Sequence, residues 1–224
     1  MSDSLCLLVE VPVCAFRPYA SREYQDTYPV PTPASVYGML LSLLGIRREH
    51  KDRHRGVEFA LAVEARPERS KVFRKLRRGA DLEDIRPDYQ DLLTELRLWI
   101  WVRRGAEVEA PCLEDRLRSG FAEKFAGVKR EGGLSLGESS YLVNAITATV
   151  PTKPLHFVLP KADGFYSLPV WVDHAAASNT VTHRFSIDED KHETLSEEHW
   201  FQIPLPTPTA DAAPAAKKSR AKPK

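Results

Sequence analysis

Residues 32–45 constrain the fold most, because their pattern predicts one short apolar helix between two strand-like runs. Thr32 followed by Pro33 is typical of a helix start, and the next residues, ASVYGMLLSLLGI, are apolar at helical spacing as far as Gly45. Residues 5–15 form a β-rich apolar run, and residues 57–65 alternate as a strand does. The sequence therefore predicts a strand, a helix and a second strand in that order.

The rest of the chain continues this alternation of strands and helices. We expect a strand over residues 92–102, an amphipathic helix over 111–125, strands over 141–150 and 155–159, a KADG turn that joins the last of these to 165–172 as a hairpin, and a short strand over 200–203. This order predicts an α+β chain: a ferredoxin-like (RRM or RAMP type) β-α-β-β-α-β domain with an additional C-terminal β-hairpin. Many unrelated proteins share that fold, so the fold alone does not establish function.

Length and composition favour one domain followed by a tail. The chain has 224 residues, 42% of them hydrophobic, which is enough for a domain over residues 1–206. Residues 207–224 are rich in Pro, Ala and Lys and are predicted to be disordered. The last eight residues carry five positive charges and no negative ones. They form either a solvated basic tail or a non-specific nucleic-acid arm whose effect fades with salt.

Several classes of protein are not indicated. The three cysteines are scattered without a CxxC pair, and the histidines show no metal-binding spacing, so we expect no metal, no cofactor and a reducing cytoplasm. The N-terminus lacks the pattern of a signal peptide, and no run is long enough to span a membrane. The sequence GGLSLGESSY is not a P-loop and there is no GxSxG motif, so nothing demands an enzyme.

Residues 66–78 carry the clearest charge signal in the chain. Seven basic residues stand against the single acid Glu68, a local balance of +6: Arg66, Arg69, Lys71, Arg74, Lys75, Arg77 and Arg78. A solvated face usually mixes signs, so this excess favours a polyanionic partner. Apolar residues within the segment, Phe73 among them, would anchor an extended hairpin. We expect a basic thumb insertion over about residues 66–91.

Two loops are weaker candidates for RNA contact. Before the first helix, arginines alternate with aromatic residues, a composition that suits single-stranded RNA: Phe16, Arg17, Tyr19, Arg22, Tyr24, Gln25 and Tyr28. In the alternative, Phe16 and Tyr28 pack on the core and the arginines are solvated. Residues 132–141 offer glycines and the hydroxyls of Ser135, Ser139 and Ser140 to phosphates, or form only a turn.

Two of these segments resemble a known family. YPVPTPASVYGMLLSLLGI, residues 28–46, resembles a proline-rich entry to a first helix whose leucine-rich run ends in LGI. GGLSLGESSYLV is similar to a glycine-rich LGxSExL-like loop, although Glu138 precedes Ser139 where many members place serine first. In these features, over about residues 5–172, the chain resembles the fifth family of CRISPR-associated proteins, the RAMP-type Cas five subunit of type I Cascade.

The resemblance implies a specific role in RNA-guided defence or DNA targeting. Such proteins clasp the 5′ handle of the crRNA and cap the backbone filament. They also contact the neighbouring backbone subunit and the large subunit that reads the PAM, so they approach target DNA only indirectly. By position, Arg17, Arg22 and Tyr28 would lie near the handle and residues 66–78 would form the thumb. The glycine-rich loop would lie beside the RNA with Gly133, Ser135, Gly137, Ser139 and Ser140.

One branch of that family cleaves precursor crRNA without metal, using Tyr, Lys and His side chains on the 2′-OH. Here Tyr24, Lys71 and His54 are only suitable residue types in plausible regions. We therefore predict a non-catalytic RNA-binding subunit with no catalytic residues. The alternatives are a metal-independent endoribonuclease that processes precursor crRNA and a general single-stranded RNA-binding module.

Overall fold

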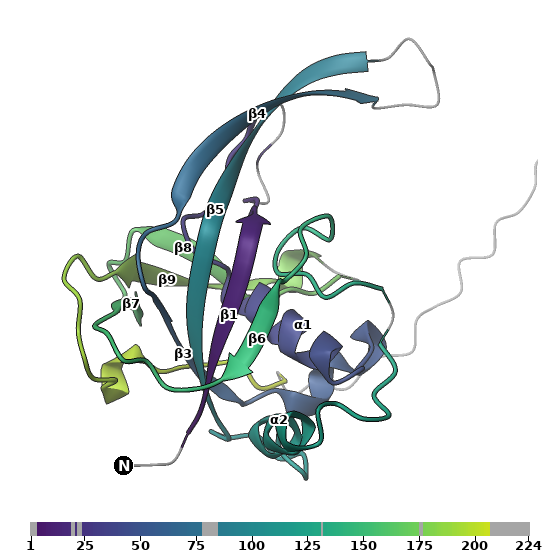
Figure 1. Ribbon diagram of the computed structural model, residues 1–224, viewed down its shortest axis with the longest axis vertical. Coiled ribbons are helices and arrows are strands. Elements are labelled where there is room, and N and C mark those ends of the chain that lie inside the picture. Colours follow the sequence, from purple (N-terminus) through teal and green to yellow (C-terminus); the bar gives the residue numbers. More distant parts are fainter. Residues whose placement is uncertain are drawn as a thin grey trace, which may run out of the picture.

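The computed structural model describes residues 4–18, 21, 24–77, 85–130, 132–174 and 177–206, with the side chains of 74–77, 85–86 and 177 left aside. The described strands join into one sheet, from which a narrow arm projects (Figure 1). The strands are β1 (Leu5–Cys14), β2 (Tyr24–Gln25), β3 (Glu58–Val63), β4 (Glu68–Arg77), β5 (Ile85–Arg103), β6 (Ala145–Ala148), β7 (His156–Pro160), β8 (Tyr166–Trp171), β9 (Val181–Ile187) and β10 (Phe201–Gln202). The helices are α1 (Pro33–Leu43) and α2 (Leu113–Ala122), with 3-10 turns η1 (Arg48–His54), η2 (Ala177–Asn179) and η3 (Glu197–His199).

The centre of the sheet has the strand order β6-β1-β5-β3, and each of these strands is antiparallel to its neighbours. Helix α1 lies between β1 and β3 in the chain, and α2 lies between β5 and β6. Beyond β3 the sheet continues through β7, β9 and β8. The predicted combination of helices and strands in one chain is therefore confirmed, and the central sheet is antiparallel.

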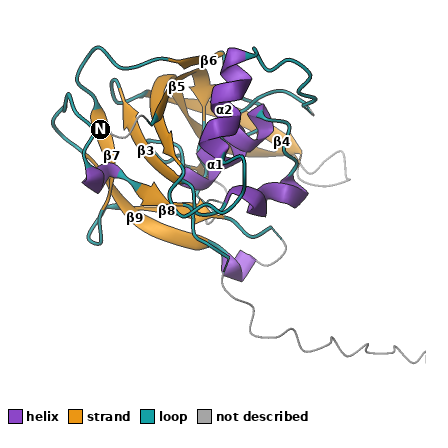
Figure 2. Cartoon of the chain, turned by 90° about the horizontal axis from the view of Figure 1, so that it is seen from below, coloured by secondary structure: helices purple, strands orange, loops and turns teal. Residues whose placement is uncertain are grey.

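Alternation along the strands divides the sheet into two apolar faces. Leu7 and Val9 of β1 pack with Leu40 of α1 and Leu117 of α2 in the main core. Figure 2 shows both helices on the same side of the sheet. The opposite face has a smaller cluster of Cys6, Ala60, Trp101 and others, which is partly covered by Leu195 and Trp200 near the end of the described chain. Because both faces are covered, the central strands are almost wholly apolar.

Helix α1 begins and ends where the sequence predicts. The Thr32 side chain accepts a hydrogen bond from the backbone N–H of Ser35 at 3.2 Å, and Pro33 is the first helical residue. The chain leaves the helix at Gly45, whose φ is +70°. A Cβ there would lie 2.6 Å from the carbonyl oxygen of Lys129, so only glycine fits. The helix is apolar on nearly every side because the core and β8 enclose it.

The predicted hairpin around KADG is wrong. β9 pairs with β7 on one side and with β8 on the other, so β7 and β8 are not neighbours in the sheet. Pro160 and Tyr166 are both opposite Phe185, from its two sides. The connecting residues cross over β9 at Gly164, where a Cβ would lie 2.6 Å from the Phe185 backbone. The chain thus keeps its direction from β7 to β8, which a hairpin would reverse.

Other boundaries differ from expectation in informative ways. The strand predicted over residues 141–150 is limited to β6, and the charged segment after α1 forms η1. β5 is longer than predicted because its first part pairs with β4. The helix predicted over 111–125 ends at Ala122, after which Lys124 and Phe125 have positive φ. No helix in the described part of the chain is both long and apolar enough to cross a membrane. Residues 207–224 lie outside that part.

The arm consists of β4 and the part of β5 that pairs with it, from Glu68 opposite Thr94 to Arg77 opposite Ile85. It extends away from the rest of the sheet (Figure 1). At the base of the arm Glu95 has a φ of +58°. There the four residues 64–67 lie opposite the three residues 95–97, so the register of pairing with β5 shifts by one residue between β3 and β4. The basic segment is therefore one strand of a long hairpin.

Candidate nucleic-acid interface

Three aromatic side chains form a row across the middle of the arm. β5 is flanked there by β2 and β4, and Tyr89 of β5 is directly opposite Tyr24 on one side and Phe73 on the other. Directly opposed residues share one face of a sheet. The exposed fractions are 44% for Tyr24, 49% for Tyr89 and 52% for Phe73, and the Phe73 and Tyr89 ring centres are 5.3 Å apart. We call these three residues the aromatic row.

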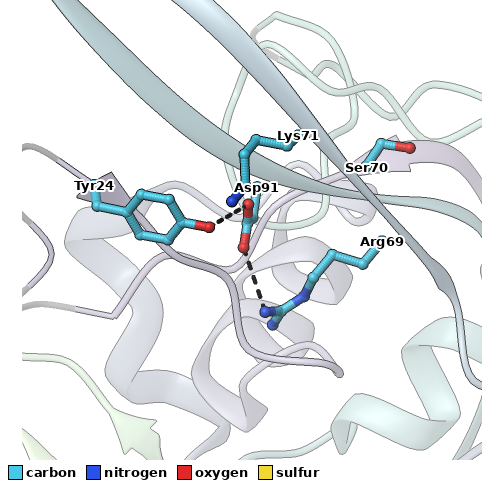
Figure 3. A pocket seen from close by; sticks show the side chains of 5 residues that line it. All are labelled: Tyr24, Arg69, Ser70, Lys71 and Asp91. Atoms are coloured by element: carbon cyan, nitrogen blue, oxygen red, sulfur yellow. Dashed lines mark hydrogen bonds and ion pairs between the residues drawn. The ribbon is translucent and has the colours of Figure 1, made fainter.

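Charged side chains lie on the same face as the aromatic row. Lys71 places its Nζ 4.9 Å from the centre of the Tyr24 ring, and the Tyr24 hydroxyl donates a 2.8 Å hydrogen bond to Asp91 (Figure 3). The Tyr24 side chain raises the pKa of Lys71, and Asp91 contributes, so Lys71 is a cation at neutral pH. Together with Arg69 and Ser70 these side chains line a shallow pocket.

Arg69 has a structural task at this site. Its guanidinium donates to the carbonyl oxygen of Thr27 at 2.8 Å and pairs with Asp26 and Asp91 at 3.4 and 3.3 Å. Asp91 is 2% exposed, and its carboxylate is paired with Arg69. Lys71 adds a favourable Coulomb interaction with the same carboxylate. These contacts join the loop before α1 to the arm, and they leave Lys71 as the more available cation of the two.

The glycine-rich loop lies on the other face of the arm from the aromatic row. Alternation turns Gln90 away from the aromatic row, and Gln90 donates a 3.0 Å hydrogen bond to Glu138 of the loop. Leu136 is fully buried in the main core. Gly137 has a φ of +89°, and a Cβ there would lie 2.4 Å from the carbonyl oxygen of Ala15. The loop is therefore a fixed turn against the end of β1 and the arm.

Within that turn, the predicted phosphate contacts differ in exposure. Ser139 and Ser140 are exposed, as is Gly133, whereas Ser135 is half-buried and bridges to Leu142. Ser139 and Ser140 are therefore the most accessible of the three serines to a ligand. The glycine-rich loop and the aromatic row thus lie on opposite faces of the arm.

The remaining predicted contacts are dispersed. Arg17 is exposed just after β1, and Arg66 is exposed just before β4. Phe16 is buried and Tyr28 packs against the core, as the alternative interpretation of this loop expected, and burial raises the pKa of Tyr28. Arg74, Lys75 and Arg77 lie in β4, but their side chains are among those left aside; Arg22 and Arg78 lie outside the described residues.

The candidate triad for RNA cleavage is not assembled. Tyr24 and Lys71 are neighbours, but His54 is fully buried, and its Nδ1 is bonded to the buried carboxylate of Glu107. Glu107 also accepts the backbone N–H of Leu113 at the start of α2. His54 therefore holds η1 and α2 together and cannot reach an RNA 2′-OH. Among the described residues, no group of acidic, His and Cys side chains is placed to hold a metal ion.

Comparison with known proteins decides the family. Residues 4–174 match the family model described as CRISPR-associated protein (Cas_Cas5). The chain belongs to the Cas5 family. A relative, the CRISPR-associated protein Cas5 of Myxococcus xanthus (strain DK1622), is 35% identical over 187 residues, which cover 79% of this chain and 86% of that protein. The resemblance seen in residues 28–46 is thereby confirmed.

A solved structure extends the comparison to the fold of this Cas5 protein. A chain of a structure described as a CRISPR RNA-guided surveillance complex superposes with a TM-score of 0.61 and 13% identity, over 84% of this chain and 90% of that chain. At this identity the match shows a shared fold. Sequence reasoning missed Tyr89, because it lies in an acidic stretch between the basic segment and the apolar part of β5.

Proposed function

We propose that this Cas5 protein is an RNA-binding subunit of a CRISPR surveillance complex of the Cascade type, where it holds the 5′ handle of the crRNA. The observation that carries the proposal is the middle of the arm, where exposed rings and a cation share one face of a strand pair. One strand of this pair, β4, is strongly basic in sequence. Such a surface combines charge for phosphates with planar faces for bases. Family membership and the RNA-guided complex that contains a chain of the same fold support the same role.

In this proposal the domain is a ferredoxin-like core and the arm is its thumb. The strand order β6-β1-β5-β3, with α1 and α2 on one face, supports a β-α-β-β-α-β core. The arm lies in the chain between β3 and the part of β5 that belongs to the central sheet, the place of an insertion in such a core. Ser139 and Ser140 of the glycine-rich loop contact the RNA from the second face.

We further propose that the protein caps the backbone filament and contacts both a backbone subunit and the large PAM-reading subunit, so that target DNA is reached only indirectly. Exposed apolar side chains away from the arm support such contacts: Val108 and Val150 are 84% and 69% exposed. Exposed apolar groups of this kind are typical of surfaces that become buried in assemblies.

The proposed role is binding without cleavage, because His54 is buried away from Tyr24 and Lys71. Incubating the purified protein with its own repeat RNA in EDTA tests this point. We expect the RNA to remain intact; a discrete product at the handle boundary would instead identify a metal-independent endoribonuclease.

The binding role is tested by comparing handle RNA with an unrelated single strand of equal length. We expect tighter binding to the handle, and recovery of a guide RNA with backbone subunits when the tagged protein is purified from its host. Equal affinity for both strands, without co-purifying subunits, would indicate a general RNA-binding module and refute the proposal.

A further inference from the structure

The aromatic row at the middle of the arm is not part of either of the described apolar clusters. Tyr24, Tyr89 and Phe73 belong to neither cluster, and each leaves roughly half of its surface open to water. Three neighbouring exposed rings of this kind usually mark a binding surface. By contrast, Phe16, at the end of β1, is 2% exposed and lies in the main core.

We propose that the aromatic row is a stacking platform for two or three unpaired bases of the bound RNA, with Lys71 holding a phosphate beside them. The proposal rests on the proposed function and specifies which part of the RNA the arm recognises: bases that are not paired. A sheet carrying exposed aromatic side chains can stack two or three bases in this way.

The spacing of the rings suits successive bases. Neighbouring strands lie about 4.7–4.9 Å apart, so Tyr24, Tyr89 and Phe73 occupy neighbouring positions on β2, β5 and β4. The observed centre-to-centre distance of 5.3 Å between Phe73 and Tyr89 agrees with that spacing. The interplanar angle of 59° leaves the two ring faces turned differently, so bases would be splayed as they are in single-stranded loops.

The charges around the row favour a nucleic acid over a protein partner. The carboxylates that face it are Asp91 and Asp26; Asp91 is buried under Tyr24 and Arg69, and Asp26 pairs with Arg69. Lys71 is exposed and cationic over the Tyr24 ring. In sequence, β4 has five basic residues and one acid. A backbone phosphate beside the rings therefore meets positive charge.

The test measures binding of the full-length protein to a short, unstructured, uridine-rich oligoribonucleotide. Removing one ring from a base-stacking site weakens binding about 5- to 150-fold. We expect that loss for Tyr89→Ala and for Phe73→Ala, and near-normal binding for Tyr89→Trp. The matched control is Phe165→Ala, which removes a ring that is 85% exposed outside the arm and should leave binding unchanged.

Salt dependence separates stacking from charge. A ring substitution should weaken binding equally at all salt concentrations. In contrast, Lys71→Ala should reduce the slope of log affinity against log salt by about 0.7, the value for one phosphate contact on a single strand. A ring variant that changes the slope instead would mean that the arm has lost its charge arrangement, which contradicts the proposal.

A second measurement changes the RNA. Replacing bases of the same oligoribonucleotide by abasic sites should weaken binding to the wild type and have little further effect on a variant lacking both Tyr89 and Phe73 rings. If wild type binds but neither ring loss nor base loss matters, the stacking platform is refuted while RNA binding stands. If ring variants keep RNA affinity but no longer co-purify with backbone subunits, the row is a protein contact and the inference is overturned. If the wild type binds no RNA, the proposed function fails with it.

Discussion

The buried pair of His54 and Glu107 gives a measurable test of how α2 is attached to the domain. His54 is fully buried and Glu107 is 3% exposed. The carboxylate bonds His54 Nδ1, and its two oxygens lie 3.0 and 3.1 Å from the backbone nitrogen of Leu113, the first residue of α2. One side chain thus joins η1 to the first turn of α2, where a negative charge is favourable.

Removing one partner should be costly. In the His54→Ala variant the Glu107 carboxylate stays buried and loses its contact with the imidazole, so that of these two partners only the Leu113 N–H remains. Breaking one side of a buried pair costs about 3–5 kcal/mol, so we expect the free energy of unfolding to fall by about that amount. The Glu107→Gln variant retains an acceptor for Leu113 and should cost less, about 1–3 kcal/mol. Arg53→Ala, which breaks a partly exposed ion pair with Glu109 at 3.5 Å, is the control and should cost about 0–1 kcal/mol.

Urea unfolding followed by circular dichroism measures these differences. In the double variant His54→Leu, Glu107→Leu no buried charge is left without a partner, so it should be less destabilised than the sum of the single leucine variants. Single variants that cost no more than the Arg53 control, with additive effects in the double variant, would refute the view that this pair fastens α2.

Three further predictions follow from other parts of the chain. Gly137→Ala should destabilise the fold by more than Gly127→Ala in the same unfolding assay, because both positions have positive φ but only at Gly137 would a Cβ meet backbone, 2.4 Å from the Ala15 carbonyl oxygen; equal losses would mean that the turn can shift. Burial raises the pKa of Cys6 and Cys14 to about 12, so at pH 8 both thiols stay protonated and should resist iodoacetamide until the protein unfolds; mass spectrometry that finds them alkylated in the folded state would contradict this. A variant in which four basic residues of residues 66–78 are changed to glutamate should show weaker guide retention and complex assembly, as judged by co-purified RNA. The four residues are Arg74, Lys75, Arg77 and Arg78. Normal assembly of this variant would contradict the role of the thumb.

The first half of the core could be predicted because its signals are local. Thr32, Pro33 and Gly45 mark the two ends of α1 through their own backbone preferences. The alternating or continuous apolar runs around α1 became β1 and β3. Each of these segments is specified by residues close together in the sequence, so no knowledge of pairing was needed.

The hairpin error has the opposite cause. Nothing local shows that β9 will lie between β7 and β8, because strand pairing is decided by contacts far apart in the chain. Gly164 was visible as a turn residue, but its reason for being glycine is the backbone of Phe185, which follows 21 residues later. A turn signal alone cannot distinguish a reversal from a crossing.

The candidate site was predictable only in part for the same reason. The basic segment was visible from its charge, but the aromatic row depends on the register of three strands that bring Tyr24, Phe73 and Tyr89 side by side. The sequence also could not show that Arg69 would be held by Asp26, Asp91 and Thr27. Charge density indicated the region, and the pairing of strands decided which side chains face outward together.

The length of β5 has a mechanical consequence. Its 19 residues run without interruption from the centre of the sheet into the arm, a distance of about 60 Å at 3.3 Å per residue. Because no loop separates the core from the arm along this strand, a force on the arm is passed directly to the core sheet. In the core sheet β5 pairs with β1 on one side and β3 on the other, whereas most of its arm part pairs with β4 alone. A pull along β5 would load the core hydrogen bonds in shear, many at once, so we expect the pairing in the arm to open first.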